Sequence, residues 1–241
     1  MRAGSPSLLH PDYWWYQARA RQLAAFFGPY VRAGDLMLDV GSADGPSVSW
    51  LDESVRRIPL DRDPRGVPPG LGVGADVMQL PFRDSTFDVV SAFDVLEHCE
   101  PEASALAEVS RVLRPGGRIL LAVPAYEWAW SSHDVHNSHR RRYTRARLER
   151  AVSRAGLQVE RSSYAFSSVF PLFAAQRLAS RARERLVRAP AAHAQDVVTV
   201  PRLPASCQRL LLGVSGLDRR LLSRVDLPFG SSVFTAAVKK G

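Results

Sequence analysis

The sequence predicts an α/β fold in which a mostly parallel sheet is covered by helices on both faces. Strand-like apolar runs alternate with helix-like segments through the first half of the chain. These runs are apolar at nearly every position, as expected for strands that are buried on both faces. The chain has 241 residues, of which 46% are hydrophobic, so it can bury a core of ordinary size. This composition excludes wholesale disorder.

Five strands are expected in the first half of the chain. Their ranges are 36–40, 56–61, 72–77, 87–95 and 117–125. Helices are expected near residues 47–53 and at 102–114, where apolar residues recur at three- and four-residue spacing. The segment between Leu60 and Val73 is rich in proline and glycine, and it is therefore expected to be a loop.

The second half of the chain adds three helices and two strands. They are a helix at 144–157, a strand at 158–166, amphipathic helices at 171–188 and 208–225 around a proline-containing linker at 190–206, and a last strand at 231–238. We therefore expect an N-terminal helical cap (1–34), a core (35–166), a helical insertion (167–230) and the last strand of the core (231–241).

The net charge of +8 is distributed unevenly along the chain. Residues 1–130 carry 12 arginines against 17 acidic residues, whereas residues 131–241 carry 20 basic residues against 7 acidic ones. The basic half therefore suits an anionic substrate or surface. Two cysteines form no disulfide framework, and no apolar leader segment is seen, so a cytoplasmic location is expected. Peripheral membrane contact stays open.

The turn after the first strand, DVGSADGP at 39–46, has the composition of a ligand-binding turn. Gly41 would allow the tight turn, and Gly45 would allow the backbone to approach a ligand closely. Such turns also join strands to helices without any ligand, so the turn alone is not specific.

Carboxylates follow the next two strands. Asp61 ends the second strand, where it could accept both hydroxyls of a ribose. Asp76 follows the third strand, where it could accept from an adenine amino group, with Val77 against the ring. A single aspartate is more often a solvated loop residue or a helix cap. One carboxylate at each strand end favours a nucleoside site.

Five segments in this order and spacing resemble the motifs of class I S-adenosylmethionine-dependent methyltransferases. They are LDVGSADG, PLD, GADVMQLPF, FDVVSAFDVLEH and LRPGGRILLAVP, and the resemblance covers residues 36 to about 165. It is closest to the bacterial branch that acts on small molecules, similar to the ubiquinone/menaquinone methyltransferases. The resemblance implies a Rossmann-like, doubly wound, mostly parallel seven-stranded sheet with a helical insertion before the last strand.

The resemblance also implies a cofactor, S-adenosyl-L-methionine, which leaves as S-adenosyl-L-homocysteine. The residues that match its binding motifs are Asp39, Gly41, Ser42 and Gly45 for the methionine part, Asp61 for the ribose, Asp76 and Val77 for the adenine, and Phe93, Asp94 and His98 beside the sulfonium. Arg19, on an aromatic N-terminal helix, could meet the cofactor carboxylate, although plain packing of that helix explains its aromatic residues equally well. The chain departs from the family pattern at Ala43 and Asp44. No metal is expected.

Four histidines fall in segments expected at the carboxyl end of the sheet. They are His98, His133, His136 and His139. The His133-x-x-His136-x-x-His139 stretch could be a solvated loop, a metal site or the wall of an acceptor pocket. We favour the last interpretation and take His133, His139 and His98 as catalytic candidates, because a neutral histidine can accept the proton that some acceptors must lose. The adjoining Arg140, Arg141, Arg142 and Tyr143 could alternatively grip a phosphate or carboxylate.

The sequence therefore predicts an enzyme that moves a methyl group to an O, N or C nucleophile of a small molecule, anionic or amphipathic in character. A non-catalytic cofactor-binding or scaffold protein is one alternative, and a methyltransferase acting on nucleic acid is another. No aromatic-interleaved basic stripe favours nucleic acid. A dehydrogenase is disfavoured because no Tyr-x-x-x-Lys pattern is found. The insertion at 167–230 could form a lid, a homodimer interface, a lipid-facing surface or an ordinary helical wrap.

Overall fold

The computed structural model describes residues 12–43, 46–63, 67, 70, 72–186 and 203–241. These residues form a seven-stranded sheet in the order β3-β2-β1-β4-β5-β7-β6. The strands are β1 (Leu36–Val40), β2 (Arg56–Asp61), β3 (Val73–Gly74), β4 (Phe87–Phe93), β5 (Leu113–Pro124), β6 (Leu157–Ala165) and β7 (Ser232–Lys239). Only β7 runs antiparallel to its neighbours. The predicted mostly parallel, doubly wound sheet is confirmed.

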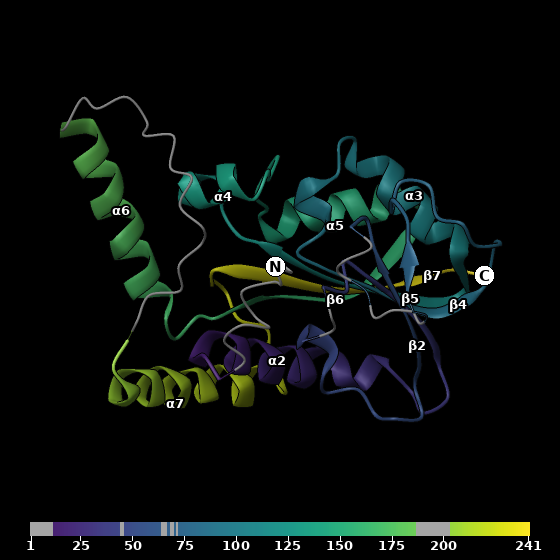
Figure 1. Cartoon of the computed structure of the whole chain (residues 1–241), viewed down its shortest axis with the longest axis horizontal. Coiled ribbons are helices and arrows are strands. Elements are labelled where there is room, and N and C mark those ends of the chain that lie inside the picture. The colour runs from purple at the N-terminus through teal and green to yellow at the C-terminus, as the bar shows by residue number, and fades with distance from the viewer. Residues whose placement is uncertain (1–11, 44–45, 64–66, 68–69, 71, 187–202) are drawn as a thin grey trace.

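Helices cover both faces of the sheet (Figure 1). They are α2 (Trp14–Phe27), α3 (Glu102–Val112), α4 (Ser132–His136), α5 (Arg145–Arg154), α6 (Phe170–Leu186) and α7 (Ala205–Leu222). Helices α2 and α7 pack together on one face, and α3 and α5 lie on the other, whereas α6 extends away beyond the edge of the sheet. The segment between β6 and β7 therefore contains helices, as the sequence predicts.

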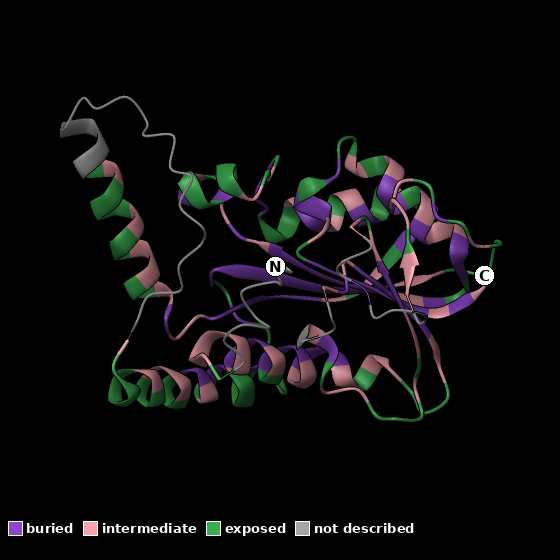
Figure 2. Cartoon of the chain, viewed as in Figure 1, coloured by how far each residue is buried: buried purple, intermediate pink, exposed green. Residues whose placement is uncertain are grey.

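The sheet is the centre of the core, and its strands are the most continuously buried segments in Figure 2. Aromatic side chains join α2 to the sheet. The ring of Phe27 lies 5.2 Å from that of Phe93 on β4 and 5.4 Å from that of Phe234 on β7, measured between centroids. All three side chains are buried. Burial of large aromatic residues anchors the N-terminal helix on the sheet.

Two sequence predictions about local structure are wrong. Residues 47–53 form no α-helix, because a short 3-10 turn at Pro46–Val48 is followed by turns. Asp52 explains this result, since its carboxylate accepts hydrogen bonds from the backbone N–H of Ser54 at 2.9 Å and from its hydroxyl at 2.6 Å. Such local side-chain bonds compete with helix formation. The third strand is also shorter than the expected 72–77, since β3 contains two residues.

The strand order creates a natural ligand site. Strand β1 pairs with β2 on one side and with β4 on the other, so the chain changes direction across the sheet between β1 and β4. In open α/β sheets, ligands bind outside the carboxyl ends of the strands at such a switch point. The residues that follow β1, β2 and β4 are the ones that the sequence assigns to the cofactor.

Candidate functional site

The turn after β1 requires glycine at position 41. Gly41 has a φ of +70°, and a Cβ built on it would lie 2.4 Å from Cγ2 of Val95. The backbone N–H groups of Gly41 and Ser42 both donate to the carbonyl oxygen of Leu60, at 2.8 and 3.1 Å. These bonds fix the turn against the end of β2. The other predicted glycine, Gly45, and its neighbour Asp44 lie outside the described residues.

Two aspartates support this turn. Asp61, at the end of β2, accepts hydrogen bonds from the backbone N–H of Ala43 at 3.3 Å and of Asp63 at 2.9 Å. Asp39 is buried and accepts a 2.7 Å hydrogen bond from the hydroxyl of Ser91. Burial raises the pKa of Asp39 above its usual range, although Ser91 and Arg57 oppose this shift. Asp39 therefore braces β1 against β4 from inside the fold.

The structure brings together two predicted residues that are far apart in the sequence. Arg19, buried on α2, forms a 2.8 Å ion pair with Asp94, whose side chain is 48% exposed at the end of β4. Asp94 has a φ of +57°, so the chain turns sharply there. Phe93, the preceding residue, is buried and packs on Phe27. Helix α2 therefore reaches the carboxyl edge of the sheet through Arg19.

Asp76 and Val77 follow β3, as predicted. Asp76 accepts a 2.9 Å hydrogen bond from the backbone N–H of Met78, and its nearest cation, Arg62, lies 3.9 Å away. Val77 is buried. An acidic residue beside an apolar side chain suits an adenine ring, and contact with that ring remains a prediction.

The residues around the turn fit the predicted cofactor. The hydroxyl of Ser42 is buried beside Asp39, yet it forms no hydrogen bond of normal geometry with a described residue. Asp39 lies close enough for Ser42 to lower its pKa, and the same hydroxyl can also donate to a ligand at the switch point. The carboxylates of Asp61 and Asp76 can accept from hydroxyl and amino groups, and Arg19 with Asp94 can meet an amino-acid group.

Three predicted histidines assemble into one cluster. The rings of His98 and His139 lie 4.8 Å apart, and those of His133 and His139 lie 6.1 Å apart, with both pairs nearly perpendicular. His98 follows β4 in a 3-10 turn (Leu96–His98), whereas His133 lies on α4 and His139 follows it. Burial lowers the pKa values of His98 and His133, and the neighbouring His139 lowers them further. His136 makes no ring contact with the cluster in the described part of the chain.

The cluster is held in place by Asp134, which is fully buried. Its carboxylate contacts Nδ1 of His139 at 2.8 Å and accepts two hydrogen bonds from Arg142, at 2.8 and 3.0 Å. Burial alone would raise the pKa of Asp134, but the bonds from His139 and Arg142 outweigh burial and lower it. A carboxylate that holds Nδ1 leaves Nε2 of His139 as the free ring nitrogen.

Sequence reasoning missed Glu97, which lies beside the cluster. Its side chain has no exposed area, and neither carboxyl oxygen accepts a hydrogen bond from another described residue. Burial and the neighbouring Asp94 raise the pKa of Glu97 well above its usual range. Glu97, His98 and His139 offer ligand atoms that lie within 4.8 Å of one another, so they could hold a cation. The sequence places Glu97 between a strand end and His98, but this position does not indicate its burial.

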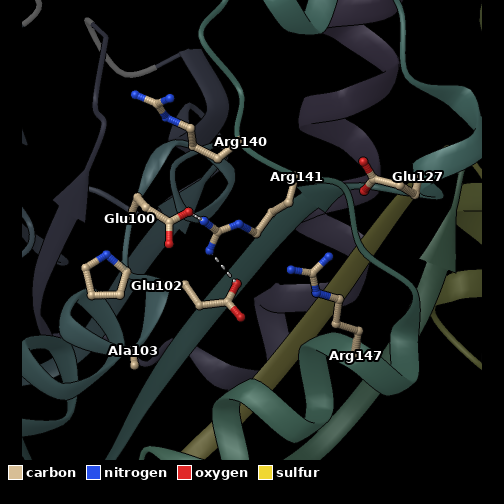
Figure 3. Close-up of a pocket in the computed structure, with 8 residues that line it drawn as sticks. Glu100, Glu102, Ala103, Glu127, Arg140, Arg141 and Arg147 are labelled. Carbon is tan, nitrogen blue, oxygen red and sulfur yellow. Dashed lines mark hydrogen bonds and ion pairs between the residues drawn. The ribbon is translucent and has the colours of Figure 1, made fainter.

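The arginines after His139 are largely neutralised by acidic partners. Figure 3 shows Arg141 between Glu100 and Glu102, and it pairs with both of them. Tyr143 donates a 2.5 Å hydrogen bond to Glu102. Glu100, Glu102 and Arg141 line an open depression of about 530 Å³, together with Arg140. The alternative in which Arg140, Arg141, Arg142 and Tyr143 together grip an anion therefore loses support, because carboxylates already occupy most of these donors.

Helix α6 contributes one unpaired cation beside the histidines. Nε of Arg177 is buried and forms no hydrogen bond within the described residues. Burial lowers the pKa of Arg177, as does Arg142, whereas Asp134 raises it. Aromatic rings lie at the base of the same helix, where Tyr126 stacks on Tyr164 at 5.2 Å and contacts Phe170 at 5.5 Å. Helix α6 thus carries both Arg177 and Phe170, which belongs to this aromatic group.

Part of the chain is similar in sequence to known methyltransferases. Residues 38–121 match the family described as methyltransferase domain. An uncharacterized methyltransferase of Mycobacterium leprae is 32% identical over 155 residues, which cover 60% of this chain and 56% of that protein. A ubiquinone/menaquinone biosynthesis C-methyltransferase of Burkholderia mallei is 38% identical over 101 residues, covering 39% and 41% of the two chains. The chain thus spans little more than half the length of the first of these relatives.

Solved structures share the fold. A putative methyltransferase in complex with the Haloferax volcanii Trm112 activator superposes with a TM-score of 0.56 at 19% identity, covering 94% of this chain and 93% of that one. A Thermotoga maritima protein described as a SAM-dependent methyltransferase, possible histamine N-methyltransferase, gives 0.56 at 14% identity over 97% and 92%. At such identities the likeness concerns the fold alone.

Proposed function

The chain belongs to the class I S-adenosylmethionine-dependent methyltransferases, and on that premise we propose that it methylates a small-molecule acceptor. The proposal rests on three features at the carboxyl ends of neighbouring strands. Ser42 follows β1, Asp61 ends β2, and the Arg19–Asp94 ion pair lies at the end of β4. When bound, S-adenosylmethionine supplies a methyl group on a sulfonium. The protein then has to place the acceptor in line with that group and exclude water.

We assign the cofactor contacts to the residues that the sequence predicts. Gly41, Ser42 and Gly45 hold the methionine part, with Asp39 bracing the turn. Asp61 accepts from the ribose hydroxyls, and Asp76 with Val77 brackets the adenine. Asp94 lies beside the sulfonium end and is oriented by Arg19. The buried hydroxyl of Ser42, at the carboxyl end of β1, supports this placement.

The histidine cluster forms the acceptor side of the site. The lowered pKa values of His98 and His133 favour the neutral imidazole, the form that can accept a proton. We assign the proton-accepting role to this cluster when the nucleophile carries a proton that must be lost. Arg177 on α6 supplies a cation for a negatively charged group of the acceptor, because its Nε has no partner.

A small-molecule acceptor is supported by the names of two relatives. One is the 27-O-demethylrifamycin SV methyltransferase of Amycolatopsis mediterranei, 34% identical over 110 residues that cover 38% of this chain and 39% of that protein. The other is the Burkholderia mallei C-methyltransferase. One name indicates transfer to oxygen and the other to carbon, so the nucleophile is left to experiment.

Turnover measurements test the histidine assignment. With an acceptor identified by screening for methylated products, His133→Ala and His139→Ala should each lower kcat at least tenfold, because the acceptor side loses its proton acceptor. Binding of S-adenosylhomocysteine should stay unchanged in both variants. Arg177→Gln should instead raise KM for an anionic acceptor. Unchanged turnover in both histidine variants would remove the assignment.

We further propose that α7 contacts an anionic lipid surface. No described helix is long and apolar enough to cross a bilayer, so the contact would be peripheral. The stripe of Leu210, Val214, Leu217 and Leu221 follows helical spacing, yet these side chains are exposed, Leu210 by 67%. Exposed arginines lie beside the stripe, and no ion pair joins them to a described acidic residue: Arg209, Arg220 and Arg224. Apolar residues flanked by cations suit anionic lipid.

A further inference from the structure

Glu97 is a buried carboxyl group without a charge to balance it. The two buried arginines nearest to it are already paired, Arg19 with Asp94 at 2.8 Å and Arg142 with Asp134 at 2.8 Å. Neither oxygen of Glu97 accepts a hydrogen bond from another described residue. An isolated buried carboxylate is costly, so such a group is either kept protonated or bound to a cation.

Two imidazole rings lie next to Glu97. His98 follows it directly, and His139 is tied to the same turn because the backbone N–H of Arg140 donates to the carbonyl oxygen of Glu97 at 2.7 Å. The ligand atoms of Glu97, His98 and His139 lie within 4.8 Å of one another. Two histidines and one carboxylate, with positions left for water or substrate, are the ligand set of many catalytic Zn²⁺ and non-haem Fe²⁺ sites.

An independent feature points to the same ligand set. Metal-binding histidines commonly donate their other ring N–H to a carboxylate, which fixes the ring and its tautomer. His139 has this support, since Nδ1 lies 2.8 Å from Asp134, leaving Nε2 for a cation. Asp134 is in turn fixed by Arg142 and by the backbone N–H of Ser131 at 2.8 Å. The carboxylate that orients His139 is therefore itself held in place.

We propose that Glu97, His98 and His139 bind a divalent transition-metal ion, for which Zn²⁺ is the test ion. Ligand atoms of a tetrahedral Zn²⁺ site lie about 3.4 Å apart, given bond lengths of about 2.0–2.1 Å. The three side chains must therefore close inward by about an ångström. His98 is exposed, so rotation of its side chain can supply this movement, whereas the buried ring of His139 is held by Asp134.

The ion would serve the proposed function by binding an oxygen of the acceptor. A divalent cation lowers the pKa of a bound hydroxyl, and the released proton would pass to His133, which lies outside the ligand set. This role rests on the proposed methyltransferase activity, whereas ion binding does not. The inference also departs from the sequence expectation of no metal, because Glu97 carries no signal of its burial in the sequence.

Metal content tests the inference without any activity assay. The full chain, free of any histidine tag, is dialysed against Zn²⁺ and its metal content is measured. We expect about one ion per chain, and at least tenfold weaker binding in Glu97→Gln and in His139→Asn. His136→Asn is the matched control, since His136 lies on α4 outside the ligand set and should leave binding unchanged. Thermal unfolding shows whether each variant is folded.

A second measurement identifies the ligands directly. Co²⁺ in place of Zn²⁺ should give a visible absorption spectrum that His98→Asn alters and His136→Asn does not. No stoichiometric Zn²⁺ binding by the wild type, or undiminished binding in folded Glu97→Gln and His139→Asn, would overturn the inference. Titration with S-adenosylhomocysteine separates the two proposals. Zn²⁺ binding without cofactor binding leaves the metal site standing and removes the methyltransferase, whereas the reverse result removes only the metal site.

Discussion

Asp134 is one buried side chain that organises the histidine cluster. It carries its charge into the interior because Arg142 and His139 hold both of its oxygens. Removal of one partner from a buried ion pair leaves an uncompensated charge, which costs about 3–5 kcal/mol. The histidine cluster therefore depends on a residue that carries no role in the sequence motifs.

The first prediction concerns the buried ion pair between Arg142 and Asp134. Arg142→Ala should lower the free energy of unfolding at pH 7 by about 3–5 kcal/mol, measured by urea denaturation. Arg145→Ala is the matched control, because it removes an exposed pair with Glu149 on α5 and should cost well under 1 kcal/mol. Equal losses in the two variants would contradict the account of Asp134.

The second prediction concerns Asp39. Burial raises its pKa above the unfolded value, so the native state retains the proton over a pH range in which the unfolded chain releases it. Stability from this group is full below the unfolded pKa, near 4, and is lost as pH rises through the folded pKa. In cofactor-free protein, the wild type should therefore lose stability relative to Asp39→Asn between pH 4 and pH 7. If the difference in the free energy of unfolding between the two proteins stays constant over this pH range, the raised pKa of Asp39 is refuted.

At the scale of single residues, the sequence predicts the residues that lie at the carboxyl ends of strands. Gly41 is predictable because a turn with positive φ, pressed against Val95, excludes a side chain. Asp61 and Asp94 are placed by the strands that they follow. Glu97 could not be predicted, since its lack of a partner depends on how Arg19 and Arg142 pair in three dimensions.

At the scale of elements, long segments with apolar patterning are predicted well. Helices α5 and α7 and strand β6 lie within a few residues of their expected ranges. The helix predicted near residues 47–53 does not form. The carboxylate of Asp52 binds the backbone N–H and hydroxyl of Ser54, and such local hydrogen bonds compete with helix formation. The short helix α4 was not predicted, because five residues carry too little periodicity.

The third prediction uses the native cysteines to test α7. Cys207 is exposed on α7, whereas Cys99 is buried and burial raises the pKa of its thiol to about 11, so a thiol-reactive fluorophore should label Cys207 selectively. The emission of the fluorophore on Cys207 should shift to the blue when vesicles rich in phosphatidylserine are added. Vesicles of phosphatidylcholine alone should cause no shift. High salt should weaken the shift.

Variants give this experiment its controls. Leu210→Asp with Leu217→Asp should abolish the shift, whereas Leu178→Asp, at an exposed position on α6, should leave it unchanged. A concentration-dependent shift without vesicles, together with a doubled mass in solution, would assign the stripe to a homodimer and refute lipid binding.

At the scale of the whole molecule, the charge differs between residues 1–130, which are acidic overall, and residues 131–241, which are basic. The acidic residues of the first half include the carboxylates that bound the proposed cofactor site. Four arginines of the second half form ion pairs with described acidic residues: Arg141, Arg142, Arg145 and Arg161. Other arginines of α5, α6 and α7, among them Arg150, Arg177 and Arg220, form no ion pair with an acidic residue in the described part of the chain.

Cofactor binding tests the central claim most directly. Isothermal titration with S-adenosylhomocysteine should give one site per chain, with at least tenfold weaker affinity in Asp61→Ala because the ribose loses its acceptor. Asp84→Ala is the matched control, since its pair with Arg111 lies at the surface. This result would support the cofactor site and the function built on it. Absence of binding by the folded wild-type chain would contradict both.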